Sequence, residues 1–496
     1  GRPVKWIGER SAAFLTDTMG RDHVSHAQLG FDQNGHILAM NVETIANMGA
    51  YLSGGGHNAS TNSGPTAMGG IYKIPSIYME SVGVFTNTTP IDAYRGAGKP
   101  EANFIIERLI DTAALRCKFD PVELRLLNAI DKFPHETAFG MRIDTGAFKE
   151  NILKASEYIQ RNSFIERKNS AQKKGLLRGL GVGCFLETAR GAPQEGVSIR
   201  FTELGKIEIR VGTESNGQGH ETTFKQIAST RLGVPIEVLE YIQADTEQVA
   251  IGFGHGGARS MHMGAGTMAL AIDSTIEKAS RVAATLLQTD IEELSFDKGA
   301  FLTSKDQRSV SIIEVASAAR NSDVMPSLGE NGIDTFYKRE EAPFTFPNGC
   351  HAAEVEIDPD TGSLTLVNYV MVDDYGSLVN PALTEGQLHG GVVQGIGQAL
   401  EEFVAFDPIS GQLLSGSLMD YTAPRAASFP FFKAHFQGVP TEANLLGVKG
   451  VGQAGCIAAP QVITHAVLNA LQEYNIDHIQ MPITSQSLWR SIQAAS

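Results

Sequence analysis

The chain has 496 residues, of which 42% are hydrophobic and 19% are charged, and its formal net charge at pH 7 is -15. This composition is typical of a soluble globular protein with a large core and about two to four average domains. The acidic balance argues against nucleic-acid binding, which requires basic patches. No apolar run in the sequence is long enough to span a bilayer.

The four cysteines, Cys117, Cys184, Cys350 and Cys456, are widely spaced and form no C-x-x-C pair. A zinc ribbon or an iron–sulfur cluster held by this chain is therefore not expected. Few, scattered cysteines suit a reducing compartment, so we expect a cytoplasmic location.

The first third of the chain predicts a hairpin followed by helices. Residues 23–30 and 37–46 have strand-like sequences on either side of Asp32-Gln-Asn-Gly35, which is a strong hairpin signal. Pro100 then opens a predicted helix, and helical sequence continues through residues 120–128. Six apolar residues of the first helix recur with helical periodicity and predict its buried face: Phe104, Ile105, Leu109, Ile110, Ala113 and Leu115.

The rest of the chain mixes further hairpins and helices. A polar segment at residues 166–174 predicts a linker or a solvated turn. The expected strands form two hairpins, 196–201 with 206–212 and 350–357 with 363–372, and the expected helices cover 148–160, 220–232, 264–287, 384–402 and 457–471. Because there is no regular βαβ alternation, the sequence predicts an α+β fold rather than a doubly wound sheet.

Five glycine-rich segments are the candidates for ligand binding: residues 92–100, 212–222, 254–264, 389–398 and 449–455. Four of them lead into predicted helices, whose first N–H groups can point at an anion. Glycine also lets the backbone approach a ligand without steric cost. Separate loops of this kind predict a large ligand with several phosphates and polar ring edges.

The last of these segments supports a competing interpretation. Gly450, Gly452 and Gly455 match G-x-G-x-x-G, and Glu473 lies roughly 20 residues further on, where a ribose-binding acid is expected. However, residues 440–445 lack the β-branched run of a buried strand, and too few residues follow for the remaining βαβ units. A nicotinamide-dependent enzyme is therefore the weaker alternative, and a tight loop packed under a helix is another.

One acidic pair also invites a catalytic interpretation. Asp373 and Asp374 lie together at the end of a predicted strand. Acids at such positions are usually solvated, so we expect no catalytic role for them.

In order and spacing, the five segments resemble the molybdopterin-binding part of the large subunit of molybdenum hydroxylases, the family of xanthine dehydrogenase, aldehyde oxidoreductase and aerobic carbon monoxide dehydrogenase. The resemblance extends from Gly1-Arg-Pro-Val-Lys-Trp6 to Leu488-Trp-Arg-Ser-Ile492. It implies a two-domain molybdopterin-binding architecture of mixed sheets with helices packed on them. The first domain would cover residues 1–140, without its N-terminal part, and the second would cover residues 141–496.

The resemblance also implies a cofactor and roles for single residues. Molybdenum would be held by a pterin dithiolene without a protein ligand, in the cytosine dinucleotide form usual in bacterial members. Gln453 and Arg95 would be catalytic, and Ala97 and Glu187 would line the substrate pocket. The implied cofactor-binding residues are Gly96, Gly217, Gln218, Gly219, His220, Gly257, Ala258, Arg259, Ser260, Met261, Gln394, Lys449, Gly450, Val451 and Gly452.

Gln453 is the first departure from the family pattern. The family places a glutamate in Gly-Val-Gly-Glu-Ala-Gly, and this glutamate takes up a proton during hydroxylation. A carboxylate can accept that proton, whereas an amide cannot. Loss of a general base typically costs about 10² to 10⁴ in rate, so we expect weakened or altered activity.

Two further departures concern neighbouring regions. Gly96-Ala97-Gly98 stands where the best-known carbon monoxide dehydrogenases carry a cysteine, so carbon monoxide oxidation is not expected. The family's earlier Phe-Gly-x-Lys loop is missing upstream of Gly1, so we expect another chain to supply the N-terminal part of the large subunit. Iron–sulfur and flavin subunits, which carry electrons onward in this family, are implied as further partners.

Together these features predict the cofactor-binding half of a molybdenum hydroxylase that acts on a small-molecule substrate. The substrate would be an aromatic N-heterocycle or an aldehyde, and water would supply the oxygen atom. The alternatives are a non-catalytic cofactor-binding or assembly homologue and, less favoured, the nicotinamide-dependent oxidoreductase.

Overall fold

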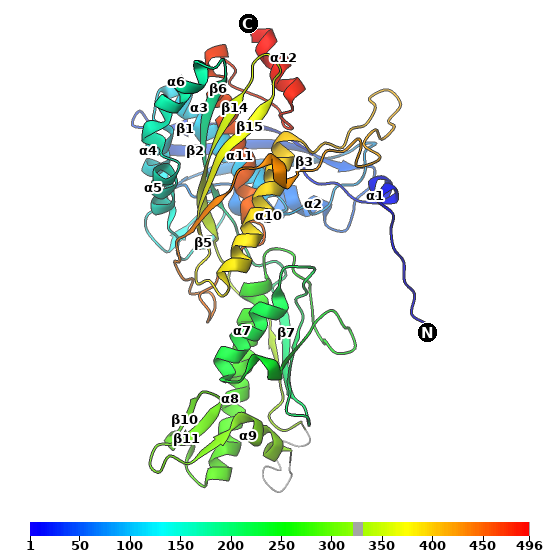
Figure 1. The fold of residues 1–496 in the computed structure, drawn as a ribbon, viewed down its shortest axis with the longest axis vertical. Helices are drawn as coiled ribbons and strands as arrows, with labels where there is room; N and C mark the ends of the chain where they lie inside the picture. Colours follow the sequence, from blue (N-terminus) through cyan, green and yellow to red (C-terminus); the bar gives the residue numbers. More distant parts are fainter. Residues whose placement is uncertain (321–330, 496) are drawn as a thin grey trace.

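The computed structural model describes residues 1–320 and 331–495. The chain forms two lobes (Figure 1), and the predicted α+β class is confirmed by its mixed sheets with helices packed on them. The larger lobe contains sequence from both ends of the chain, and the smaller, distal lobe (green in Figure 1) is built from the middle of the chain.

The larger lobe contains two main sheets. The first has the order β1-β2-β3 and the second the order β16-β15-β14-β6. Its strands are β1 (His23–Phe31), β2 (Ile37–Gly49), β3 (Ile77–Phe85), β4 (His135–Glu136), β5 (Arg142–Ile143), β6 (Leu177–Leu186), β14 (Asn348–Ile357), β15 (Leu364–Asp374) and β16 (Lys433–Phe436). Its helices are α1 (Arg10–Thr16), α2 (Gly56–Asn58), α3 (Lys99–Cys117), α4 (Pro121–Asn128), α5 (Phe148–Tyr158), α6 (Phe164–Gln172), α10 (Pro381–Leu400), α11 (Ala454–Ala470) and α12 (Ser485–Ala495).

The distal lobe contains a four-stranded sheet of order β13-β7-β8-β9 and a small sheet of order β10-β11-β12. Its strands are β7 (Glu195–Phe201), β8 (Ile207–Val211), β9 (Leu239–Ile242), β10 (Leu294–Asp297), β11 (Ala300–Thr303), β12 (Ser309–Ser311) and β13 (Thr335–Arg339). Its helices are α7 (His220–Leu232), α8 (Gly266–Leu287) and α9 (Ile312–Ala319), which share one hydrophobic core with the four-stranded sheet.

The three predicted hairpins are confirmed. β1 pairs with β2, β7 with β8, and β14 with β15, each in antiparallel register. The helix predicted after Pro100 is confirmed as α3, although its buried face differs from the prediction. Leu115 is exposed, whereas the polar residues Asn103 and Glu107 are buried because they have partners in β6 and α4.

Helix α11 runs through the middle of the larger lobe (Figure 1) and is buried along almost its whole length. It lies against β6, where Gly179, Gly181 and Gly183 alternate along one face of the strand. A side chain at any of these three positions would collide with α11, so the glycines allow the helix to pack directly on the strand. This contact holds the body of α11 against the sheet, and Gln453 lies at the N-cap position of the same helix.

One other predicted segment differs from the structure. Residues 166–174 were expected to be a linker or a turn, yet α6 covers most of them. The glycine-rich segment 389–398 lies inside α10, in agreement with the helix predicted over residues 384–402, so its N–H groups belong to the helix. Its glycines instead allow a close helix contact, since a Cβ at Gly391 would lie 3.1 Å from the Cys456 nitrogen of α11.

A continuous hydrophobic core crosses the predicted domain boundary at residues 140/141. Ile37 and Ile106, before the boundary, belong to the same buried cluster as Phe148 and Cys184, after it. The packing therefore has no gap at this position, and the two-domain division remains a prediction.

Candidate functional site

Arg95 holds three of the glycine-rich segments together. Its Nε donates a hydrogen bond to the Gly452 carbonyl oxygen at 2.6 Å, and its Nη1 donates to Gln394 Oε1 at 3.2 Å. Its Nη2 donates to the carbonyl oxygen of Gln387 at 3.1 Å. The half-buried guanidinium thus ties its own loop to α10 and to the start of α11.

Gln453 lies at the N-cap position of α11 and contacts Glu187 at the end of β6. We assign its amide nitrogen toward Glu187, because the opposite orientation would set the amide oxygen against two carboxylate oxygens. In the assigned orientation the nitrogen donates to both oxygens of Glu187, at 2.9 and 3.1 Å. We refer to Arg95, Glu187, Gln394, Gly452 and Gln453 as the junction.

Glu187 is the most deeply buried member of the junction. It has no exposed surface, whereas Gln453 is half-buried. Burial raises the pKa of Glu187 to about 7, and the ammonium of Lys99, at 4.0 Å, acts in the lowering direction. The Gln453 N–H groups also favour the ionised carboxylate, because they donate hydrogen bonds to it.

The remaining segments close a ring of contacts around the junction. Gly450 packs against the loop at 254–264, since a Cβ at Gly450 would lie 2.6 Å from the Ala258 carbonyl oxygen. Ser260 in that loop shares a 2.9 Å hydrogen bond with Thr213 in the segment 212–222. A Cβ at Gly219 would lie 2.9 Å from Leu383 in α10, which carries Gln394. All five segments are therefore linked in one circuit.

Two basic residues with implied cofactor roles have their side chains engaged elsewhere. The fully buried Arg259 pairs with Glu195, with 2.9 Å between Nη1 and Oε2, and also donates to the carbonyl oxygens of its own lobe. Lys449 Nζ lies 2.7 Å from Asp374 Oδ2, and both side chains are buried. Neither cation is free to bind a phosphate, so any contact from these residues would come from the backbone.

The acid pair after β15 is buried rather than solvated. Besides its ion pair with Lys449, Asp374 accepts hydrogen bonds from the backbone nitrogens of Gly376 and Val439. Asp373 accepts from the hydroxyl of Tyr375 at 2.9 Å and lies 3.0 Å from His351 Nε2. Both carboxylates are therefore buried and have close polar partners, and the expectation of solvated acids is wrong.

The segment 212–222 places its polar side chains in two ways. Gln218 Oε1 accepts hydrogen bonds from within its own loop, including 3.1 Å from Ser215. His220 is buried, and its Nδ1 has no hydrogen-bond partner. Burial lowers the pKa of His220 to about 4, and the nearby His255, whose Nδ1 is also unpartnered, acts in the same direction. Each ring therefore has a nitrogen whose hydrogen-bonding capacity no other side chain or backbone group uses.

Met261 and Val451 pack as apolar residues, and Ala97 forms a turn. Met261 lies against the core of the distal lobe and Val451 against the core around α11. Ala97 adopts a φ of 40° and donates its N–H to the Tyr94 carbonyl oxygen at 2.7 Å. Gly96, in the same turn, has a φ of 99°, and a Cβ there would lie 2.5 Å from Pro100.

Comparison with known families decides the assignment. Residues 1–129 and residues 151–430 each match the family described as "Molybdopterin cofactor-binding domain". The chain belongs to the molybdenum hydroxylase large-subunit family.

Similar proteins cover almost the whole chain. The large chain of a carbon monoxide dehydrogenase from Hydrogenophaga pseudoflava is 30% identical in an alignment that covers 99% of this chain and 63% of the relative. The large subunit of nicotine 6-hydroxylase from Paenarthrobacter nicotinovorans is 30% identical in an alignment that covers 99% of this chain and 62% of the relative. The structure of quinoline 2-oxidoreductase from Pseudomonas putida 86 has a TM-score of 0.93 at 31% identity, over 99% of this chain and 65% of that one. The chain thus spans less than two thirds of the length of these proteins.

The residues present fit a molybdopterin cofactor in two respects. First, a Cβ at Gly217, Gly256 or Gly452 would meet no atom within 4 Å, so these glycines border open space rather than packed protein. Second, the buried Nδ1 atoms of His220 and His255 have no hydrogen-bond partner, and a polar ligand could supply one to each. Among residues 1–320 and 331–495, no three His, Cys, Asp or Glu residues gather to hold a metal ion.

The nicotinamide alternative does not suit the loop at residues 449–455. A dinucleotide fingerprint follows a strand of a parallel sheet. In the described chain, residues 437–449 before this loop form only one isolated bridge, at Val448, and no strand. Helix α11 packs on a sheet in which β6, β14 and β15 are antiparallel. The fingerprint match is therefore a coincidence of glycine spacing.

Sequence reasoning missed two residues of this region. Gln387 accepts two hydrogen bonds from Arg95, and Lys99 is the cation that faces Glu187. Gln387 lies seven residues before Gln394 in the same helix, so the shared face was visible in the spacing. Lys99 lies in the segment 92–100, but nothing in the sequence connected it with Glu187.

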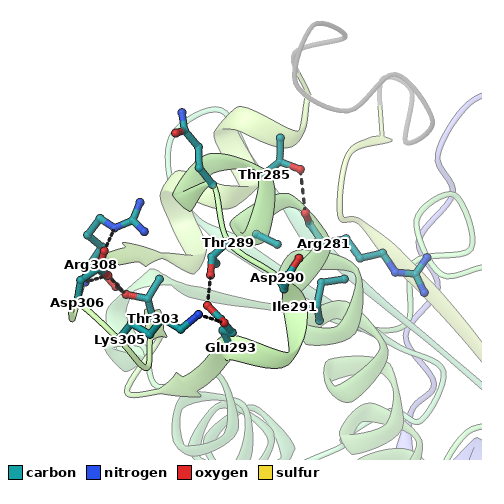
Figure 2. A pocket seen from close by; sticks show the side chains of 12 residues that line it. Arg281, Thr285, Thr289, Asp290, Ile291, Glu293, Thr303, Lys305, Asp306 and Arg308 are labelled. Atoms are coloured by element: carbon teal, nitrogen blue, oxygen red, sulfur yellow. Dashed lines mark hydrogen bonds and ion pairs between the residues drawn. The ribbon is translucent and has the colours of Figure 1, made fainter.

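A separate hollow of about 830 Å³ lies in the distal lobe, at the end of α8 (Figure 2). Four of its charged side chains form two ion pairs, Lys305 with Glu293 and Arg308 with Asp306. None of the predicted site residues, all of which the structure describes, lines it. The described residues also include no helix long and apolar enough to cross a membrane.

Proposed function

We propose that this chain is the cofactor-binding part of a molybdenum hydroxylase-type oxidoreductase that oxidises an aromatic N-heterocycle or an aldehyde, with the oxygen atom taken from water. The observation that carries the proposal is the closed ring of contacts. Arg95 links residues 92–100 to α10 and to Gly452, and the Gly450–Ala258 and Thr213–Ser260 contacts link the other loops. Five segments that are distant in the sequence thus meet in one region, as the binding of a single large ligand would require.

The expected cofactor is molybdenum with molybdopterin, in the cytosine dinucleotide form, and it supplies the two-electron redox chemistry when bound. Gly217, His220 and the backbones of residues 257–261 and 450–452 would hold it. The pterin dithiolene, rather than a side chain, would hold the metal. Arg95 fixes the three segments that border Gln453, and Glu187 fixes the Gln453 amide itself.

Gln453 sets the expected level of activity. Its amide can donate and accept hydrogen bonds, but it cannot hold a proton at neutral pH. A hydroxylation that depends on a general base would be slower by about 10² to 10⁴. This same residue supports the second candidate, a cofactor-binding or assembly homologue that does not turn over.

The substrate class is favoured by the relatives and by the local geometry. Nicotine and quinoline, which appear in the names of two similar proteins, are both aromatic N-heterocycles. A cysteine at Gly96, as in the best-known carbon monoxide dehydrogenases, would require a Cβ only 2.5 Å from Pro100 at a φ of 99°. This turn therefore argues against carbon monoxide as the substrate. Ala97 leaves room where purine-oxidising members carry an aromatic ring.

The proposal includes partners and a location. The relatives are longer than this chain, which covers 63% and 62% of the first two, so further polypeptide would complete the pocket. The division into domains at residues 1–140 and 141–496 belongs to the same proposal. Iron–sulfur and flavin subunits would receive the electrons, and the complex would be cytoplasmic.

The test begins with the purified protein in its native complex. We expect close to one molybdenum per chain and release of CMP on acid treatment. Gln453→Glu should then raise turnover of N-heterocycles or aldehydes with an artificial electron acceptor. Bound molybdenum without any gain in activity would favour the non-catalytic homologue, and absence of both molybdenum and CMP would reject the proposal.

A further inference from the structure

The contact between Glu187 and Gln453 has a consequence beyond the binding of a cofactor. Glu187 has no exposed surface, whereas Gln453 is half-buried. Gln453 therefore stands between Glu187 and the open side of the junction. A ligand on that side would touch the amide and not the carboxylate.

The protonation state of Glu187 decides how the amide can face it. An ionised carboxylate accepts hydrogen bonds only, so it requires the amide nitrogen, as in the 2.9 and 3.1 Å contacts. A neutral carboxyl group carries an O–H donor, which requires the amide oxygen. The two ends of the amide differ in polarity, so whichever end faces Glu187 leaves the other end for the ligand.

We propose that Glu187 is a positioning residue that sets which end of the Gln453 amide faces the open side of the junction. With Glu187 ionised, the ligand meets the amide oxygen, which accepts a hydrogen bond from an O–H or N–H group of the substrate or of water. With Glu187 neutral, the ligand meets the amide nitrogen, which donates. The nature of this ligand rests on the proposed function, but the coupling between the two side chains does not.

The surroundings of Glu187 support a reversal at moderate pH. Among the residues that the structure describes, Lys99 at the start of α3 is the charged group that faces Glu187, and its ammonium lies 4.0 Å from Oε1. Burial raises the pKa of Glu187, while Lys99 and the Gln453 N–H groups favour the ionised form. The ionised state, with the amide oxygen toward the ligand, is thus the one expected above neutral pH.

The pair also constrains any attempt to restore a basic residue at position 453. In Gln453→Glu, two carboxyl groups would lie about as close as the present amide and carboxylate. Two carboxyl groups at such a distance share a proton, because ionisation of both would place two negative charges side by side at a high cost in free energy. The single substitution should therefore yield a base that is fully ionised only above neutral pH, where its gain in turnover is expected, whereas the exchanged pair Glu187→Gln/Gln453→Glu keeps one carboxylate and one amide in contact.

The first test needs no bound cofactor. Equilibrium unfolding of the full chain is measured at pH 5 and pH 8 for the wild type, both single variants and the exchanged pair. We expect Gln453→Glu to increase the unfolding equilibrium constant at least about tenfold more at pH 8 than at pH 5. In the Glu187→Gln background this difference should fall to about twofold or less.

A matched control separates pairing from the general effect of removing a carboxylate. Glu402, in the segment after α10, is partly buried, accepts a hydrogen bond from Tyr421 at 3.1 Å, and has a pKa that burial raises. Glu402→Gln should leave the pH effect of Gln453→Glu unchanged. The proposal is overturned if Gln453→Glu has the same effect in the wild-type and Glu187→Gln backgrounds. If Gln453→Glu does not fold, folding of the exchanged pair supports the proposal and failure of both variants rejects it.

The second test uses turnover in preparations with equal molybdenum content. We expect the acidic limb of the pH–rate profile of Gln453→Glu to lie at least about one pH unit above that of the exchanged pair, because one carboxyl of a close pair has a raised pKa. Coincident limbs would overturn the positioning role. Stability coupling without any molybdenum in the protein would reject the proposed function and leave the pairing intact.

Discussion

Glu187 and Glu195 are both fully buried, and burial raises the pKa of each to about 7, yet they lie in different settings. Glu195, in the distal lobe, is paired with the guanidinium of Arg259 at 2.9 Å. Glu187, at the junction, has the Gln453 amide as its direct partner, and its nearest cation, Lys99, lies 4.0 Å away. One carboxylate is neutralised by a fixed charge, and the other is held by a side chain that can turn.

The difference shows how the same residue type can serve structure or chemistry. A buried carboxylate with a close, full counter-charge belongs to an arrangement that is costly to break. A buried carboxylate held mainly by an amide has a partner that can turn when the carboxylate gains or loses a proton. The two glutamates therefore predict different responses to the loss of their partners.

The largest expected effect concerns the fixed pair. Arg259→Ala would leave Glu195 buried without its counter-charge, and we expect a loss of about 3–5 kcal/mol in the free energy of unfolding. Denaturant unfolding measures this loss. Arg281→Ala is the control in the same lobe, because its 3.0 Å pair with Glu277 is exposed and should cost less than about 1 kcal/mol. Equal losses in the two variants would remove the contrast between buried and exposed pairs.

The pH dependence of stability tests Glu187 directly. Its pKa in the folded chain, about 7, lies above the reference value of 4.5, so the folded state binds the proton more tightly than the unfolded state. Its stabilising contribution is therefore complete below about pH 4.5 and is lost as pH rises to about 7, by up to ~3 kcal/mol.

Glu187→Gln should remove this part of the pH dependence and leave the part due to Glu195. The measurement is the free energy of unfolding at several pH values between 4 and 8 for both proteins, about the range over which the two states differ in bound protons. Parallel curves for the wild type and Glu187→Gln would show that Glu187 is not a titrating group in this range.

A pair of glycines sharpens the contrast between packed and open parts of the site. In Gly450→Ala the new Cβ would lie 2.6 Å from the Ala258 carbonyl oxygen, and we expect a loss of about 1–3 kcal/mol. Gly452→Ala meets no atom within 4 Å, so stability should change by less than about 0.5 kcal/mol. Its molybdenum content should nevertheless fall, because the methyl group enters the space expected for the cofactor. Unchanged molybdenum in Gly452→Ala would place the cofactor elsewhere.

The smallest effect is expected in the hollow shown in Figure 2. Lys305→Ala removes an ion pair with Glu293 whose lysine side chain is 75% exposed. We expect little change in stability, because water screens an exposed ion pair, and no change in molybdenum content. A drop in bound molybdenum would mean that the hollow, and not the junction, serves the cofactor.

Much of the fold could be predicted because local patterns and tertiary packing agree. Turn residues such as Asp32 to Gly35 set the hairpins, and Pro100 set the start of α3 within one residue. The buried face of α3 could not be predicted, because Glu107 is buried by an ion pair with Arg125 and a hydrogen bond from Tyr72. Those partners come from other elements, and the helical periodicity of apolar residues gives no information about them.

The site was predictable as a set of segments but less so as a set of side chains. The resemblance identified the loops around Arg95, Gln453 and Glu187, and the structure brings these residues together. It did not show that Arg259 and Lys449 form buried ion pairs with Glu195 and Asp374, which lie far away in the sequence. Buried ion pairs of this kind depend on which strands meet, and single-sequence patterns carry no such information.

The most direct measurement is an anomalous difference map of the crystallised complex, recorded at the molybdenum absorption edge. We predict one peak per chain on the open side of the junction, bordered by the Gln453 side chain and by Gly452. A peak in the distal lobe, or no peak at the junction in a preparation with one molybdenum per chain, would contradict the convergence of the five segments on a single cofactor.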